Sequence, residues 1–167
     1  MIALVAFISA ATSTAGPTSV DNFRCAGPSP VELANVQAVH QAYQQRSVEI
    51  VRLALANSRS RLTGMVDSAA KFTVFHGDVG LGPRDQGIDA AVEFAKQISP
   101  RTYEYSNGSG PVGMNPCGLI STEVTFSGDD PAQADRIRFK YEKGVLTEVS
   151  GGHLEVTRGH IGSEGHP

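Results

Sequence analysis

The sequence lacks the features that mark several large classes of protein. Its basic residues are scattered, and 14 Lys and Arg stand against 17 Asp and Glu, for a formal net charge of −3. Without a clustered basic face, nucleic acid is not expected as a partner. The apolar run at residues 2–11 is too short to span a bilayer. What remains is a chain of 167 residues with the length and composition of one globular domain.

Motifs for cofactors, metals and covalent catalysis are also missing. The glycines of GDVGLG, residues 77–82, have the wrong spacing for a dinucleotide fingerprint, and no helix opens directly behind them. No cluster of His, Cys and Asp has the spacing of zinc ligands, and there is no GxSxG nucleophile motif. We therefore expect no cofactor and no metal site.

Cysteine is rare, since Cys25 and Cys117 are the only two. They are far apart in the sequence, with no CxxC pair and no metal-type spacing. In an exported chain they can form one disulfide, which would stabilise the fold by ~4–5 kcal/mol in the chain-entropy model. The alternative is two buried free thiols that pack as small hydrophobic groups. We predict the disulfide.

Residues 1–15 are interpreted as a signal peptide. The apolar run ends in small residues, and residues 13–15 (STA) fit a cleavage site, although no Lys or Arg precedes the run. We expect a secreted or periplasmic protein; the alternative is a cytoplasmic protein with a buried or disordered extension. Residues 16–29 are rich in Gly, Pro and Ser and predict a linker. A domain is expected over 30–157, followed by a flexible tail over 158–167.

The start of the domain predicts helices. Ser29 can cap a helix, Pro30 suits the first helical position, and Glu32 completes a capping box. No Gly or Pro interrupts residues 31–63, which is long for one globular helix. A break is therefore predicted at Ser47, whose hydroxyl can cap a second segment.

Alternating apolar and polar residues predict strands in the rest of the chain. The predicted strands are 71–76, 102–106, 119–127, 136–142 and 145–157, and an amphipathic helix is predicted over 88–98. A short turn is expected at Asp67 and Ser68, and a hairpin turn at Lys143 and Gly144. Helices followed by consecutive strands indicate an α+β fold, with helices covering one face of a curved antiparallel sheet.

The order of these elements resembles the NTF2-like superfamily, which includes SnoaL-like and ketosteroid isomerase-like proteins. The resemblance rests on the helical start, the lead DSAA into the strand KFTVFH, the helix IDAAVEFAKQI and the long terminal strands. It implies a cone: a curved mixed or antiparallel sheet with N-terminal helices packed on its concave face. Because the family spans enzymes, ligand binders and assembly modules, the resemblance implies a fold and a pocket rather than one activity.

His76, Asp78 and Tyr43 are the candidate catalytic residues. Isomerase-like members have a pocket Tyr on the first helix, where Tyr43 stands, but an Asp base near the first strand, where this sequence has His76. This departure argues against a steroid-type isomerase. A His can act as a general acid or base, Asp78 can orient it, and Tyr43 can donate to a developing oxyanion.

The alternative for these residues is structural. His76 can cap the strand end, and Asp78 can form an Asx turn. Tyr43 can be a core aromatic residue whose hydroxyl finds a partner.

Aromatic, apolar and basic residues near the expected pocket are the candidate ligand contacts. They are Phe72, Val74, Arg84, Tyr103, Tyr105, Phe126 and His153. Arg84 can bind an acidic ligand or pair with Asp85 or Asp89, and His153 can reach the pocket or lie on an exposed edge. We expect a small apolar or acidic ligand.

Three function classes follow. The leading one is an exported protein that binds a small ligand in the cone without catalysis. The alternative is a small isomerase, cyclase or hydratase that uses His76 with Asp78 and Tyr43. A third is an assembly module, because the broad sheet face suits a homodimer.

Overall fold

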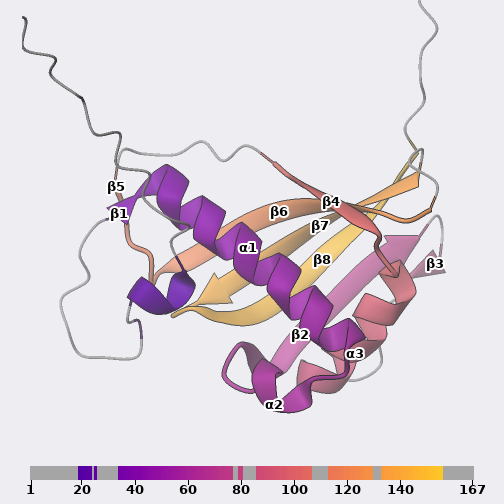
Figure 1. Cartoon of the computed structure of the whole chain (residues 1–167), viewed down its shortest axis with the longest axis horizontal. Helices are drawn as coiled ribbons and strands as arrows, with labels where there is room; N and C mark the ends of the chain where they lie inside the picture. Colours follow the sequence, from indigo (N-terminus) through magenta and orange to yellow (C-terminus); the bar gives the residue numbers. More distant parts are fainter. Residues whose placement is uncertain are drawn as a thin grey trace, which may run out of the picture.

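The computed structural model describes residues 19–23, 25, 34–76, 79–80, 86–106, 113–129 and 133–155. In this part of the chain, a curved sheet of six strands wraps around one long helix (Figure 1). In chain order the elements are η1 (Val20–Phe23), β1 (Ala34–Asn35), α1 (Val36–Leu55), α2 (Arg59–Leu62), β2 (Val66–His76), β3 (Val79–Gly80), α3 (Gly87–Ile98), β4 (Thr102–Tyr105), β5 (Gly113–Met114), β6 (Leu119–Ser127), β7 (Gln133–Glu142) and β8 (Val145–Glu155).

The sheet is mixed, with the strand order β3-β2-β8-β7-β6-β4. β2 and β8 run parallel, and the other neighbouring pairs are antiparallel. α1 crosses the concave face diagonally, with α2 and α3 near its C-terminal end and η1 and the small β1–β5 ribbon near its N-terminal end (Figure 1). The predicted α+β class is confirmed, since the curved mixed sheet forms a cone with helices packed on its concave face.

α1 is one continuous helix. The side-chain oxygen of Asn35 accepts hydrogen bonds from the backbone N–H groups of Gln37 (2.9 Å) and Ala38 (3.2 Å), so Asn35 is the N-cap. The prediction of a helix that runs on from Ser29 is therefore wrong. Ala34–Asn35 is extended instead, because it pairs with β5.

Ser47 lies in the middle of α1 and does not break it. Its hydroxyl donates to the carbonyl oxygen of Tyr43 at 2.9 Å and lies 2.7 Å from the hydroxyl of Tyr141 on β7. These partners satisfy a fully buried hydroxyl inside the core. The predicted break at Ser47 is therefore wrong. One of the two partners of its hydroxyl, Tyr141, lies on a strand far along the chain, so the local sequence does not reveal it.

β2 begins earlier than predicted, so the predicted turn at Asp67 and Ser68 is wrong. The register of β2 against β8 shifts after Val66, which marks an irregularity in the strand. The carboxylate of Asp67 still accepts from the backbone N–H of Ala69 at 2.7 Å, as in a local turn. Gly87, at the start of α3, packs closely against this part of β2. A Cβ at Gly87 would lie 2.7 Å from the carbonyl oxygen of Ser68.

The other predicted strands are confirmed over the residues that the structure describes. β6 has the predicted bounds and buries alternate residues, and β7 begins at Gln133, slightly before the predicted start. Lys143 and Gly144 form the predicted hairpin turn with positive φ angles of 51° and 82°. Gly151 allows β8 to approach β7 closely, because a Cβ at this position would collide with the carbonyl oxygen of Arg136.

Aromatic side chains fill the space between the sheet and the helices. Phe94 of α3 packs on Phe72 of β2 and on Phe139 of β7, with ring centroids 5.5 Å and 6.5 Å apart. Tyr43 and Tyr141 pack nearer the other end, with ring centroids 4.9 Å apart. All five side chains are buried. Side chains therefore occupy the centre of the cone.

The end of the cone near η1 is closed by a disulfide between Cys25 and Cys117, whose Cα atoms are 5.2 Å apart. The predicted disulfide is confirmed. Val20 of η1 belongs to the core, and Asp21 pairs with the buried guanidinium of Arg46 on α1. Residues 19–23 and 25 are thus packed on the domain.

Candidate functional site

A groove runs between α1 and the edge strand β4. It consists of two adjoining cavities of about 520 Å³ and 80 Å³, which share Val48, Arg52 and Tyr103. Their other lining residues are Gln45, Glu49, Val51, Leu53, Leu55, Arg61, Pro100, Arg101, Thr102, Tyr105 and Phe126. We call this feature the α1–β4 groove. Its volume is within the range of ~300–1,000 Å³ typical of small-molecule sites.

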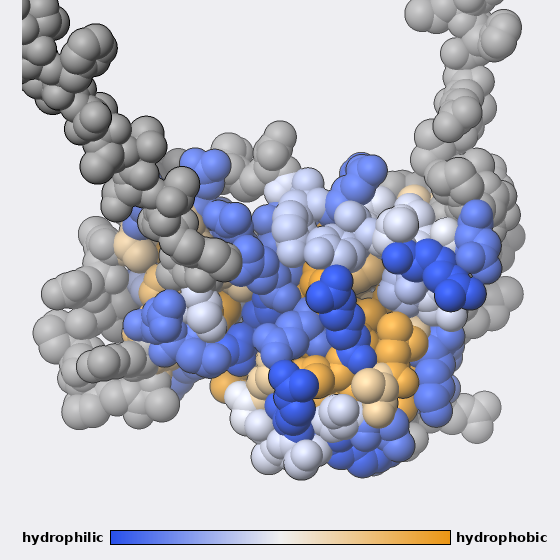
Figure 2. All heavy atoms as spheres, in the orientation of Figure 1, coloured by the Kyte–Doolittle hydropathy of each residue, from blue (hydrophilic) through white to orange (hydrophobic). Residues whose placement is uncertain are grey.

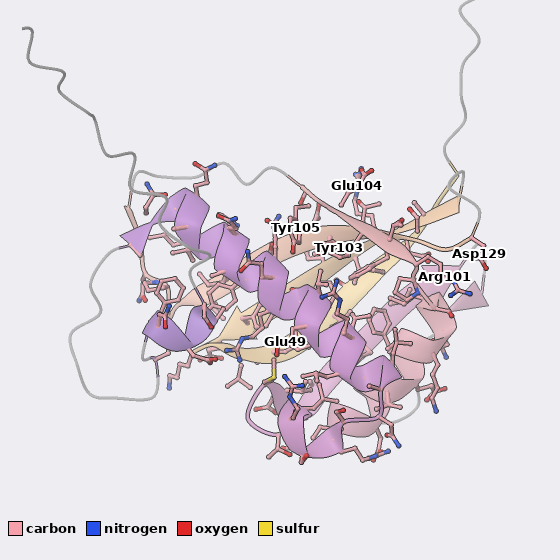
Figure 3. The ribbon with its side chains drawn as sticks, viewed as in Figure 1. Glu49, Arg101, Tyr103, Glu104, Tyr105 and Asp129 are labelled. Carbon is pink, nitrogen blue, oxygen red and sulfur yellow. A yellow bond between two sulfur atoms is a disulfide. The ribbon has the colours of Figure 1, made fainter. Side chains whose placement is uncertain are left out.

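Two tyrosines form the β4 wall of the groove. Tyr103 and Tyr105 alternate along β4, so both point toward α1, whereas Glu104 points to the opposite side (Figure 3). Their ring centroids are 5.3 Å apart, and the side chains are 38% and 39% exposed. Two partly exposed rings side by side offer a surface on which a flat ligand can stack.

Arg52 brings a positive charge to the same wall. Its guanidinium carbon lies 5.5 Å from the centroid of the Tyr103 ring, a cation–π contact. Arg61 and Arg101, which also line the groove, are paired with Glu49 at 3.3 Å and Asp129 at 3.1 Å. Within the described ranges, Arg52 has no carboxylate partner. It is therefore the groove arginine available to an anionic ligand.

The floor of the groove is apolar. Val48 and Val51 of α1 and Phe126 of β6 are buried beneath it, and Leu55 is 40% exposed at its side. Figure 2 shows hydrophobic residues gathered near the centre of this face, crossed by hydrophilic ones. The groove thus combines an apolar floor, an aromatic wall and, among the residues described, one arginine without a carboxylate partner.

The tyrosines of the groove differ in their surroundings. Burial raises the pKa of Tyr105 to about 12; the neighbouring Tyr103 phenol adds to this effect, and Arg52 opposes it. At neutral pH the Tyr105 hydroxyl is therefore protonated. It can serve a ligand as a hydrogen-bond donor but not as a general base.

Tyr43 lies away from the groove, inside the core. Its hydroxyl donates to the carbonyl oxygen of Pro116 at 2.5 Å, and its ring stacks on Phe23 at a centroid distance of 6.4 Å. The structural alternative for Tyr43, a core aromatic residue with a satisfied hydroxyl, describes this environment. No described contact places it at a cavity.

The structure brings together some of the predicted ligand contacts and separates others. Tyr103, Tyr105 and Phe126 line the α1–β4 groove. Phe72 and Val74 are 5% and 2% exposed and belong to the core. β2 and β4 are separated in the sheet by β8, β7 and β6, so these two residues do not share a strand pair with the tyrosines.

Several predicted site residues lie outside the described residues. Asp78 and Arg84 are among them, as are the side chains of His76 and His153. The backbone of His76 ends β2 and pairs with Val79 of β3, so a short strand occurs where the sequence predicts only loop. The catalytic role of His76 and Asp78 stays a prediction.

Arg52 and the α1 side of the groove were not predicted as site residues from the sequence. Val48, Arg52 and Leu55 recur at helical spacing, which brings them to one side of α1. That spacing is visible in the sequence, but it indicates a helix face packed in the core as readily as one that lines a ligand site. The partner of this face, β4, becomes visible only in the folded chain.

Among the residues that the structure describes, no group of three or more His, Cys, Asp or Glu side chains lies close enough to hold a metal ion. None of the described helices is both long and apolar enough to cross a membrane.

No family model matches the sequence, and no curated protein matches it. One solved structure that resembles the chain is a cystatin-like fold protein from Burkholderia xenovorans, with 10% identity and a TM-score of 0.47 over 75% of this chain and 99% of that one. An NTF2-like protein from the same organism shows 14% identity and a TM-score of 0.39 over 67% and 92%. A de novo designed NTF2 fold protein shows 13% identity and a TM-score of 0.38 over 66% and 84%.

Proposed function

We propose that the domain binds a small molecule with a flat apolar body and a carboxylate group in the α1–β4 groove, without catalysing its conversion. The observation that carries the proposal is the position of Arg52. Its guanidinium lies beside the exposed Tyr103 ring and has no carboxylate partner among the described residues. A planar guanidinium binds carboxylates in a two-point geometry, which favours this ligand class.

The apolar part of the ligand has matching surfaces. It would rest on Val48, Val51 and Phe126 and stack against the two tyrosine rings. An aromatic contact adds ~0.5–1.5 kcal/mol beyond the burial of apolar area. At a ligand efficiency of about −0.3 kcal/mol per non-hydrogen atom, a ligand of roughly 15–20 atoms would bind with a Kd of roughly 40 µM to 0.5 mM.

The test uses matched pairs of probes that differ only in charge. We expect 2-naphthoate and phenylacetate to raise the Tm of the protein at millimolar concentration, and 2-naphthamide and phenylacetamide to raise it less. The carboxylate gains the contact with Arg52, whereas the amide gains only stacking and burial. Equal shifts from acid and amide, or no shift from any of the four, would contradict the proposal.

We propose further that the protein works outside the cytoplasm. The Cys25–Cys117 disulfide supports this location, because such bonds persist mainly in oxidising compartments. A homodimer through the outer sheet face stays a prediction. Light scattering that shows a monomer at micromolar concentration would remove it.

A further inference from the structure

A second hollow lies where β4 ends, and it shares no lining residue with the α1–β4 groove. We call it the polar cavity. It has a volume of about 250 Å³, and its wall is polar: His40 and Gln44 of α1, Ser106 after β4, Thr122 and Glu123 of β6, and Arg138 of β7. We propose that the polar cavity binds a small neutral molecule that carries several hydroxyl groups.

The buried hydroxyl of Thr122 is the first feature that indicates a ligand. Its side chain is 3% exposed, on the inward side of β6 beside Ile120 and Val124. Within the described ranges, its hydroxyl oxygen has no hydrogen-bond partner. A buried hydroxyl without a partner lowers stability, and Val would fill the same space without that cost. A ligand hydroxyl in the cavity would supply the missing bond.

Gln44 provides a second, fixed polar group. Its side-chain nitrogen donates to the carbonyl oxygens of Ser106 (2.5 Å) and Glu123 (3.4 Å), so the amide of this 6% exposed residue is held in one orientation. Its side-chain oxygen then stays an acceptor, and none of the described groups donates to it. Thr122 and Gln44 together offer both a donor and acceptors to a hydroxylated ligand.

The charges in the wall favour a neutral ligand over an ion. Arg138 donates from Nε (2.9 Å) and Nη2 (2.5 Å) to one carboxylate oxygen of Glu123, so the two charges cancel. An anion or a cation would have to compete with this pair. A neutral polyol can hydrogen-bond to the same groups, and to the exposed hydroxyl of Ser121, without separating them. The volume lies just below the usual range of small-molecule sites, so the ligand is of monosaccharide size.

The test compares two threonines on the same strand. Thr122→Val removes the unpartnered hydroxyl, and Thr125→Val makes the same change at a position of β6 that does not line the cavity. Isothermal titration of the full chain with D-glucose, D-galactose and myo-inositol is expected to detect binding of at least one of them. Thr122→Val should weaken that binding at least about tenfold, whereas Thr125→Val should leave it within twofold.

Stability gives an independent measurement. Without ligand, the Tm of Thr122→Val is expected to equal or exceed that of the parent protein, because the unpartnered hydroxyl is gone. Three results would overturn the proposal: no binding of any of the three polyols, an unchanged Kd in Thr122→Val, or a lower Tm of this variant, which would mean that the hydroxyl has a partner within the protein. Failure of the α1–β4 groove to bind 2-naphthoate would leave this test untouched, since the two sites share no lining residue.

Discussion

The hydroxyl of Tyr43 donates to the carbonyl oxygen of Pro116 at 2.5 Å and so joins the middle of α1 to the residue before Cys117. Burial raises the pKa of this phenol to about 12, and Arg46 opposes the shift. Tyr43 is therefore a protonated donor at neutral pH. Its one described acceptor, the carbonyl oxygen of Pro116, belongs to the end of the cone that the disulfide closes.

Tyr43→Phe is expected to lower the free energy of unfolding by about 1–3 kcal/mol, because the buried carbonyl of Pro116 loses its donor. Binding of 2-naphthoate should stay within twofold, since Tyr43 does not line the α1–β4 groove. Chemical denaturation and titration of the same preparation measure both effects. A variant with unchanged stability but lost binding would show instead that Tyr43 serves the ligand.

Stability is expected to fall at alkaline pH. Burial raises the pKa of Tyr43 to about 12 and also raises that of Tyr141, whereas an unfolded Tyr titrates near pH 10. The folded state keeps these protons after the unfolded state has lost them. The stabilisation is therefore complete below about pH 10 and is lost as the pH rises through the folded pKa, at ~1.4 kcal/mol per pH unit for each phenol.

Denaturation at a series of pH values measures this loss. We expect the contribution of the two buried tyrosines to the free energy of unfolding to stay constant up to about pH 10 and to decline above it. The decline should be less steep in Tyr43→Phe, which has one phenol fewer. Parallel declines in the parent and the variant would mean that Tyr43 titrates normally in the folded protein.

The disulfide is expected to be a major source of stability. It closes a loop with a sequence separation of 92 residues, for which chain entropy gives roughly 4–5 kcal/mol. Replacing both cysteines, as Cys25→Ser with Cys117→Ser, should lower the free energy of unfolding by up to about this amount. As a control, alkylation of the denatured but unreduced protein should label no thiol. Two labelled thiols would contradict the bond.

His76→Ala is expected to leave the Tm shift caused by 2-naphthoate largely intact. His76 ends β2, and three strands separate β2 from β4 in the sheet. Thermal shift of parent and variant at equal ligand concentration checks this. If a reaction is found for the protein, a rate loss of at least about 10²-fold in His76→Ala would favour the catalytic alternative.

The strands with one buried face could be predicted closely from the sequence. Ile137, Phe139 and Tyr141 alternate with charged residues, and a shift by one position would bury those charges, so the register has one solution. The same alternation puts Tyr103 and Tyr105 on one side of β4, where both line the groove.

Features that depend on distant partners could not be predicted. Ser47 has the local chemistry of a helix cap, but its contact with Tyr141 keeps it inside α1. Arg52 looks like any exposed helix residue until β4 places Tyr103 beside it. Thr122 likewise follows the pattern of an inward strand position, and only the folded structure shows that its hydroxyl lacks a partner among the described residues.

The most direct test of the central claim replaces one arginine at a time. Arg52→Gln removes the groove cation, and Arg136→Gln removes an exposed cation from the outward side of β7 as the matched control. Isothermal titration of the parent and both variants with 2-naphthoate and 2-naphthamide gives six dissociation constants. Because a charge-assisted contact contributes ~1.5–3 kcal/mol, Arg52→Gln is expected to weaken 2-naphthoate binding by about 10- to 150-fold. The same variant should leave the Kd of 2-naphthamide within twofold. Arg136→Gln should change neither Kd. An unchanged Kd for 2-naphthoate in Arg52→Gln would contradict the proposed function.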